Sequence, residues 1–220
     1  MHDDGEKYRN MNLTRVITTA FVLIFATSVI FGQTRPDALL EYRQGNYERS
    51  VQICLQEISV NAGNLESYVV LCWSFLRLGR YEEATRYGRT ARSLSRYDAR
   101  VTEILGEAYY FQGRNSEALQ YFQEYINLSP EGQRIETVYY YIGEIYIRMG
   151  KFRHADIALS TAVYWLPGNA NWWVRLAFSR ENAGDLIQAV SAYEKALELN
   201  SQLSDARRGL ERVRQALSSR

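Results

Sequence analysis

Few residues in this sequence have the type and spacing that catalysis or metal binding requires. Its two histidines and two cysteines leave little material for a structural zinc site, which takes four such ligands. His154 lies among charged neighbours, a pattern that favours a solvated surface histidine over a catalytic one. Glu103, Glu107 and Glu144 could be the paired carboxylates of a catalytic site. We favour the interpretation that they are polar residues that line a groove. We therefore predict that the protein is not an enzyme and binds no cofactor or metal.

The composition limits the remaining functions. The 220 residues are 46% hydrophobic and 23% charged, as in an ordinary folded protein. A formal net charge of +1 provides no field that would attract nucleic acid, so we predict no nucleic-acid partner. The low proline count of three predicts long helices. The aromatic content of 13% predicts that bulky side chains fill the contacts between those helices.

The N-terminal segment, residues 1–32, has the outline of a secretory signal. A charge-free apolar run of sixteen residues from Val16 to Phe31 follows Arg15, and a short basic stretch beginning at Met11 suggests the true start. The run is shorter than the roughly 20 residues that span a bilayer comfortably. We expect export to the periplasm or cell envelope, with membrane contact only through this segment. An uncleaved inner-membrane anchor and a buried core helix are the alternatives.

Glycines at a nearly fixed period organise residues 33–220. Successive positions are separated by 34, 34, 37 and 34 residues, at Gly45, Gly79, Gly113, Gly150 and Gly184. Apolar residues recur three and four apart on both sides of each glycine, which predicts two amphipathic helices joined by a tight turn. Such a period is typical of a solenoid, in which each unit buries its apolar face against its neighbours.

The repeats resemble those of the tetratricopeptide repeat family, in which small and bulky residues alternate at set positions. The fourth unit matches best, with Tyr139, Ile142, Gly143, Tyr146, Ala155, Leu159, Ala162 and Pro167. The resemblance implies an all-α superhelical solenoid of about five helix-turn-helix repeats, over residues 36–64, 65–98, 99–135, 136–169 and 170–203. The first repeat is degenerate, and three extra residues after Pro130 lengthen one loop. Residues 204–219 are predicted to form a capping helix, with Ser204 as its N-cap.

The resemblance also implies where a partner binds, because members of this family hold a peptide or helix against the concave wall formed by the first helices. The residues expected to face that wall are Tyr42, Val69, Trp73, Glu103, Glu107, Tyr110, Tyr140, Glu144, Arg148, Val174 and Phe178. Chaperone-docking relatives carry a Lys/Asn clamp for a carboxylate there, whereas this wall presents Val70, Glu103 and Glu107. That difference argues against binding of a chaperone tail.

Two other groups have alternative interpretations. In this family the helices that carry Cys54 and Cys72 are packed neighbours, so the two residues are expected to be either buried thiols, which we favour, or a disulfide in an oxidising compartment. Arg86, Arg89 and Arg96 are expected on the outer face, either as a solvated surface or as a docking patch for an acidic partner.

The sequence thus predicts a non-enzymatic scaffold or adaptor in the cell envelope that binds a protein or peptide in its concave groove. The alternatives are an accessory subunit that helps a transport system to deliver a ligand and, less favoured, a hydrolase with an unrecognised site.

Overall fold

The computed structural model describes residues 37–219, and every regular element in that range is an α-helix. The predicted signal or anchor in residues 1–32, with its start at Met11, lies outside the described residues. Within residues 37–219, no helix has the length and apolar character needed to cross a membrane.

The helices form five consecutive pairs followed by a single helix. The first helices are α2 (Ala38–Arg43), α4 (Leu65–Arg77), α6 (Ala99–Phe111), α8 (Ile135–Arg148) and α10 (Ala170–Ala183). The second helices are α3 (Tyr47–Val60), α5 (Tyr81–Leu94), α7 (Asn115–Leu128), α9 (Phe152–Trp165) and α11 (Leu186–Leu199), and α12 (Ser204–Ser218) follows them. The degenerate first repeat has a first helix of only six residues.

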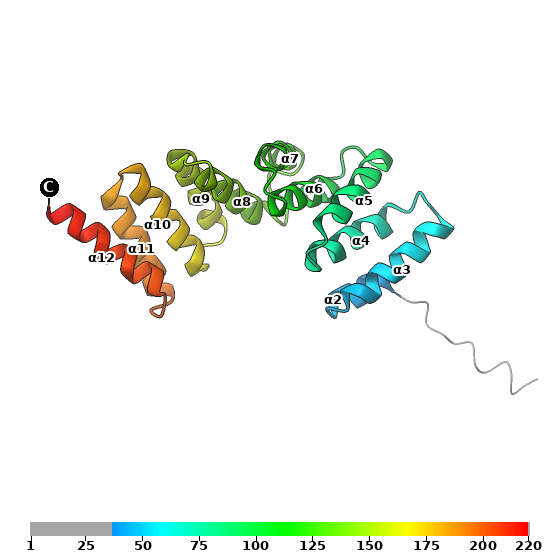
Figure 1. Ribbon diagram of the computed structural model, residues 1–220, viewed down its shortest axis with the longest axis horizontal. Coiled ribbons are helices and arrows are strands. Elements are labelled where there is room, and N and C mark those ends of the chain that lie inside the picture. The colour runs from blue at the N-terminus through cyan, green and yellow to red at the C-terminus, as the bar shows by residue number, and fades with distance from the viewer. Residues whose placement is uncertain (1–36, 220) are drawn as a thin grey trace, which may run out of the picture. The chain divides into compact units, whose positions relative to one another are not determined.

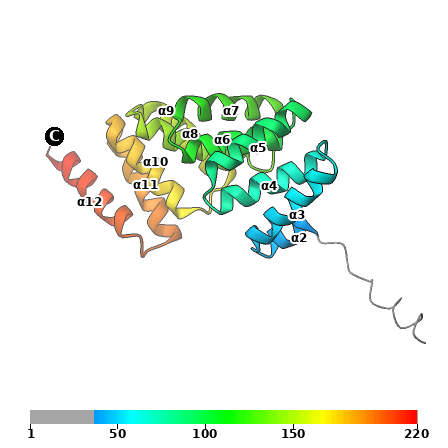
Figure 2. The same ribbon diagram turned by 45° about the vertical axis from the view of Figure 1, so that its right-hand side comes forward.

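Packing between neighbours builds the solenoid. Each first helix packs against its own second helix and against the next first helix, so that α2, α4, α6, α8, α10 and α12 form one continuous row. Figures 1 and 2 show this succession from α2, in blue, to α12, in red. The arrangement confirms the predicted fold class, an all-α solenoid of five helix pairs with a capping helix.

The periodic glycines form the turn within each pair, as the sequence predicts. All five have a positive φ, from 68° at Gly150 to 87° at Gly184. The amide after each glycine donates to a carbonyl five residues earlier, as from Arg80 to Phe75 at 2.9 Å, which caps the end of the first helix. Glycine is needed because an L side chain is strained at this φ.

Small residues allow the two helices of a pair to approach closely. A Cβ atom on Gly106 would lie 2.6 Å from the ring of Phe122, and a Cβ atom on Gly143 would lie 2.5 Å from Leu159 Cγ. Both bulky partners are fully buried. The alternation of small and large residues in the sequence therefore reflects direct contact between paired helices.

The start of the capping helix differs from the prediction. The N-cap of α12 is Leu203 rather than Ser204, which is the first helical residue, and no side chain caps the helix. Leu203 packs partly buried against the core of the last repeats. The chain therefore enters α12 with an apolar contact at the N-cap instead of a hydroxyl hydrogen bond. The helix then buries Ala206, Leu210 and Val213.

Candidate partner-binding groove

The predicted groove residues all lie on the row of first helices, but they are not equally accessible. Val69 is fully buried, so its assignment to the accessible wall is wrong. It occupies a core position on α4, where the hydrophobic spacing places it against neighbouring helices. The side chains that keep partial exposure are Tyr42, Trp73, Glu107, Tyr140, Arg148, Val174 and Phe178.

Tyr110, Glu103 and Glu144 are buried groove residues held by arginines. The Arg148 guanidinium lies 4.0 Å from the centre of the Tyr110 ring and donates to the Tyr110 carbonyl at 3.1 Å. The buried Tyr110 ring packs under the Arg148 guanidinium. Of the five aromatic residues expected on the wall, Tyr110 is therefore buried, and the other four, Tyr42, Trp73, Tyr140 and Phe178, keep part of their surface exposed.

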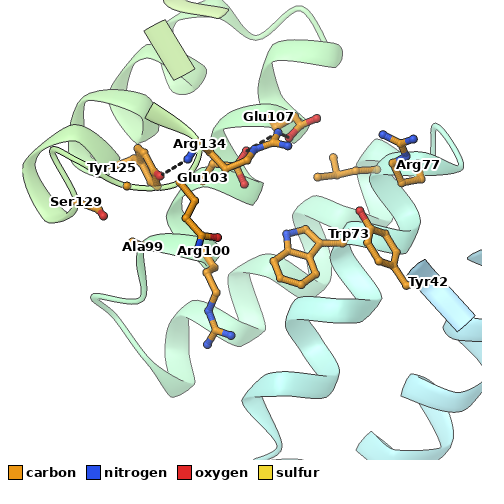
Figure 3. A pocket seen from close by; sticks show the side chains of 13 residues that line it. Tyr42, Trp73, Arg77, Ala99, Arg100, Glu103, Glu107, Tyr125, Ser129 and Arg134 are labelled. Atoms are coloured by element: carbon orange, nitrogen blue, oxygen red, sulfur yellow. Dashed lines mark hydrogen bonds and ion pairs between the residues drawn. The ribbon is translucent and has the colours of Figure 1, made fainter. Parts of the chain in front are cut away.

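A pocket of about 500 Å³ lies where α2, α4 and α6 meet the loop after α7. Figure 3 shows Trp73 and Tyr42 on one side of it and Glu103, Glu107 and Arg134 on the other. The centres of the Trp73 and Tyr42 rings are 5.9 Å apart, and Leu76, also on α4, adds to the apolar lining. The pocket thus combines an aromatic side with a charged one.

The lengthened loop provides the charged residue that completes the pocket. Six residues, 129–134, connect α7 to α8, whereas four residues, 61–64, connect α3 to α4. The Tyr125 hydroxyl accepts a hydrogen bond from the Arg134 amide at 3.2 Å. Gly132 lies so close to Tyr125 that a Cβ atom would overlap the phenol oxygen. The loop is therefore packed on α7, and Arg134 extends from its end toward α6.

Arg134 is shared by two carboxyl groups one helical turn apart. Its Nη2 lies 3.0 Å from Glu103 Oε1 and 2.9 Å from Glu107 Oε2. The Tyr141 hydroxyl of α8 donates to the other oxygen of Glu107 at 3.2 Å. Two consecutive repeats, the third and the fourth, thus contribute to one polar network.

Burial controls the ionisation of this network. Removal from water raises the pKa of the Glu103 carboxyl to about 8; Arg134 opposes that rise and Glu107 adds to it. Burial and the adjacent Glu107 also raise the pKa of Tyr141 above its ordinary value. Burial disfavours the charged form of Arg134, but the two carboxyl groups hold its pKa above the ordinary value.

The other two arginines that line the pocket have different partners. Arg100 donates to both oxygens of Glu66 at 2.8 Å and to Asp98 at 2.7 Å. Arg77 donates to the Tyr47 hydroxyl at 3.3 Å, and its guanidinium lies 5.6 Å from the centre of that ring. Neither of them forms an ion pair with Glu103 or Glu107.

A second polar and aromatic group occupies the groove at α8 and α10. Arg175 donates to both oxygens of Glu144, at 2.6 and 2.9 Å. The Tyr140 ring stacks on Trp172 at 4.9 Å, and burial raises the pKa of Tyr140 to about 12. Phe178 lies 6.2 Å from the Phe152 ring. These contacts link neighbouring repeats and leave part of each aromatic surface accessible.

The sequence analysis did not identify Arg134, Tyr141, Arg175 or Trp172 as groove residues. Their partners are 31 to 34 residues away for Arg134–Glu103, Arg175–Glu144 and Tyr141–Glu107. A comparison of polar side chains about one repeat apart would have suggested these pairs, since residues at that separation lie on adjacent first helices or, like Arg134, directly before one.

The remaining predicted sites lie outside the groove. Cys54 and Cys72 are buried, free thiols, and burial raises the pKa of both. His154 is exposed, 5.2 Å from the Tyr146 ring. Arg86 and Arg96 are exposed on the second helix α5 and in the loop that follows it, while Arg89 donates to the Tyr109 hydroxyl at 3.1 Å. Within residues 37–219, no group of three metal-ligating side chains comes together.

Comparisons with known proteins agree with this architecture. Two family models, both described as tetratricopeptide repeat, match residues 70–132 and residues 170–203. The chain is a tetratricopeptide repeat protein. A search of curated proteins found no match.

Solved structures of tetratricopeptide repeat proteins have the same fold. MamA is 20% identical with a TM-score of 0.67, and the match covers 77% of this chain and 97% of MamA. PilF of Pseudomonas aeruginosa is 17% identical with a TM-score of 0.71, covering 82% of this chain and 81% of PilF. Cut9, in a complex with Hcn1 from APC/C, is 17% identical with a TM-score of 0.68, covering 80% of this chain but 34% of that one. At these identities the likeness concerns the fold.

Membership of this family gives the general function. Tetratricopeptide repeat proteins are protein–protein interaction scaffolds and are generally not enzymes, because their stacked helices provide extended surfaces instead of reactive centres. The chain is accordingly a scaffold for protein partners.

Proposed function

We propose that this protein is an adaptor of the cell envelope that holds a peptide segment of a partner protein against its row of first helices. The pocket bounded by Trp73, Tyr42 and Arg134 is the observation that carries the proposal. Its volume of about 500 Å³ lies within the range of pockets that hold side chains or small ligands, about 300 to 1,000 Å³. Aromatic and arginine side chains are also the residue types that contribute most to interfaces.

The row of first helices continues beyond this pocket, which supports an extended ligand over a single buried side chain. Trp73, Tyr140 and Phe178 belong to α4, α8 and α10, and each keeps part of its ring exposed. A segment lying along the first helices could contact all three repeats. A partner that is itself unstructured there would gain affinity from several modest contacts.

The proposed location rests on the sequence of residues 1–32. The apolar run Val16–Phe31 supports export, and cleavage is expected to leave a mature chain beginning between Val29 and Thr34. N-terminal sequencing of the native protein tests this step. A chain that begins intact at Met1 or Met11 would contradict cleavage and favour an anchored form.

Two pairs of substitutions test the groove once affinity purification from envelope extracts has provided a partner. Trp73→Ala with Tyr140→Ala is expected to weaken binding tens-fold or more, because an aromatic anchor is worth about 2 kcal/mol in an interface. Arg86→Glu with Arg96→Glu is the control on the outer surface, where exposed charges contribute about 0 to 1 kcal/mol. Arg89 is omitted because it donates to Tyr109. If the charge reversals abolished binding while the aromatic changes had no effect, the outer face would be the docking surface.

A further inference from the structure

The groove pocket has an imbalance of charge on one wall. Glu103 and Glu107 both contact it, and Arg134 is the cation with which they pair among residues 37–219. Arg100 is neutralised by Glu66 and Asp98, and Arg77 is held at the Tyr47 hydroxyl. Two carboxyl groups therefore share one guanidinium. Burial and the adjacent Glu107 keep a proton on Glu103 at neutral pH, and a further cation at this wall would favour release of that proton, so that each carboxylate has a matching cation.

The opposite wall is suited to the stem of a long side chain. Trp73, Tyr42 and Leu76 line it, and the two rings are tilted at 33° with centres 5.9 Å apart. Lysine and arginine bury their methylene stems on such surfaces while the charged head seeks a polar partner. The face of an aromatic ring also attracts a cation directly.

We propose that the pocket binds an arginine or lysine side chain of the partner segment, an inference that rests on the groove function proposed above. The stem lies against Trp73 and Tyr42, and the head donates to the carboxylates of Glu103 and Glu107 beside Arg134. An incoming acidic side chain fits less well, since Arg134 already faces two carboxyl groups and a third would compete for the same guanidinium. The bound cation favours loss of the Glu103 proton to water and so completes a set of two positive and two negative charges.

A selection from a library of short random peptides on the purified full chain tests the proposal. We expect peptides enriched in arginine or lysine at one position. The variant Glu103→Gln with Glu107→Gln should lose that enrichment. The matched control, Glu82→Gln with Glu211→Gln, removes the same charge from exposed positions and should retain it.

A change in the peptide tests the same contact without altering the protein. Replacing the selected basic residue by norleucine, which keeps an apolar stem, should weaken binding at least ten-fold by isothermal titration calorimetry. The double glutamine variant should bind both peptides with similar affinity. Because the first comparison uses only the unmodified chain, it remains informative if that variant fails to fold.

The outcomes separate this inference from the groove function. Enrichment of acidic residues, or equal binding of the norleucine peptide, would overturn the basic-ligand proposal even if Trp73→Ala still abolished binding. Selected peptides whose affinity is unchanged by Trp73→Ala would overturn the groove function itself. A selection that yields no binding peptide counts against both.

Discussion

Arg134 and Glu107 lie 27 residues apart in the sequence, yet Arg134 Nη2 donates to Glu107 Oε2 at 2.9 Å. The contact joins the loop after the third repeat to the first helix of that repeat. It forms the wall of the groove pocket, so the position of the loop and the shape of the pocket depend on the same charges.

Removing the guanidinium should therefore destabilise the fold as well as the pocket. Arg134→Gln leaves the Glu103 side chain, 4% exposed, beside Glu107 with no cation to offset either carboxyl group. Breaking a buried ion pair costs about 3–5 kcal/mol, but the Arg134 side chain is 47% exposed, so we expect a loss of about 1–2 kcal/mol. Urea unfolding measures it, with Arg134→Lys expected to recover part of the loss. Equal stability of Arg134→Gln and the original chain would show that the network contributes nothing to folding.

The stability of the chain should also depend on pH through Glu103. Its folded pKa of about 8 exceeds the ordinary value of 4.5, so between these pH values the folded chain holds a proton that the unfolded chain has released. The contribution of Glu103 to stability is fully present below about pH 4.5 and is lost as pH rises to about 8. The groups facing it are Glu107, Arg134, Tyr125 and Tyr141, and the two tyrosines titrate above this range.

Glu103→Gln provides the measurement, since glutamine does not titrate. Compared with this variant, the original chain should lose about 1 kcal/mol or more of unfolding free energy between pH 5 and 8. Glu82→Gln, at an exposed position outside the pocket, should follow the original chain. Parallel pH profiles for the original chain and Glu103→Gln would mean that the Glu103 pKa is not raised by folding.

The sequence predicts the helix pairs well because their turns have a local cause. Each periodic glycine adopts a positive φ, and the residues that stabilise the turn lie within five positions of it. The same local logic places the predicted groove residues on the row of first helices. A period of glycines is therefore sufficient to define the repeats.

The pocket was less predictable because its contacts cross repeats. The extra residues after Pro130 were recognised as a longer loop, but their length alone does not indicate that Arg134 reaches α6. The family resemblance predicts Val69 on the wall, whereas packing in the core buries it completely. Side-chain exposure on a first helix depends on both neighbouring repeats, which a single helical pattern does not include.

Close helix contact should make Gly106 intolerant of a side chain. Gly106→Ala places a Cβ atom 2.6 Å from the buried Phe122 ring, so the ring or the helix must move. Overpacking of this kind typically costs about 1–3 kcal/mol. Gly168→Ala is the control, because no atom lies within 4 Å of its Cβ position. The two variants should differ clearly in thermal unfolding, and equal midpoints would contradict the tight contact.

The turn glycines should be sensitive for a different reason. Gly113→Ala meets no atom within 4 Å, but Gly113 has a φ of 72°. The expected cost is about 1–2 kcal/mol from the backbone alone. Gly113→Asn should cost less, because asparagine tolerates this conformation better than alanine does. Denaturant unfolding that ranked alanine above asparagine would contradict a left-handed turn at this position.

The capping helix α12 allows a test of how far stability spreads along the solenoid. Leu210 is 8% exposed and packs with the core of the last repeats, so Leu210→Ala should cost about 2–3 kcal/mol. In a solenoid each repeat contacts only its neighbours, so the loss should be local. Hydrogen exchange is expected to accelerate in α10, α11 and α12 while α4 and α6 remain protected. Arg207→Ala, at an exposed position on the same helix, should leave exchange unchanged. Equal acceleration in α4 and α12 would instead mean that residues 37–219 open as one cooperative unit, because a purely local loss at the cap cannot reach the second repeat.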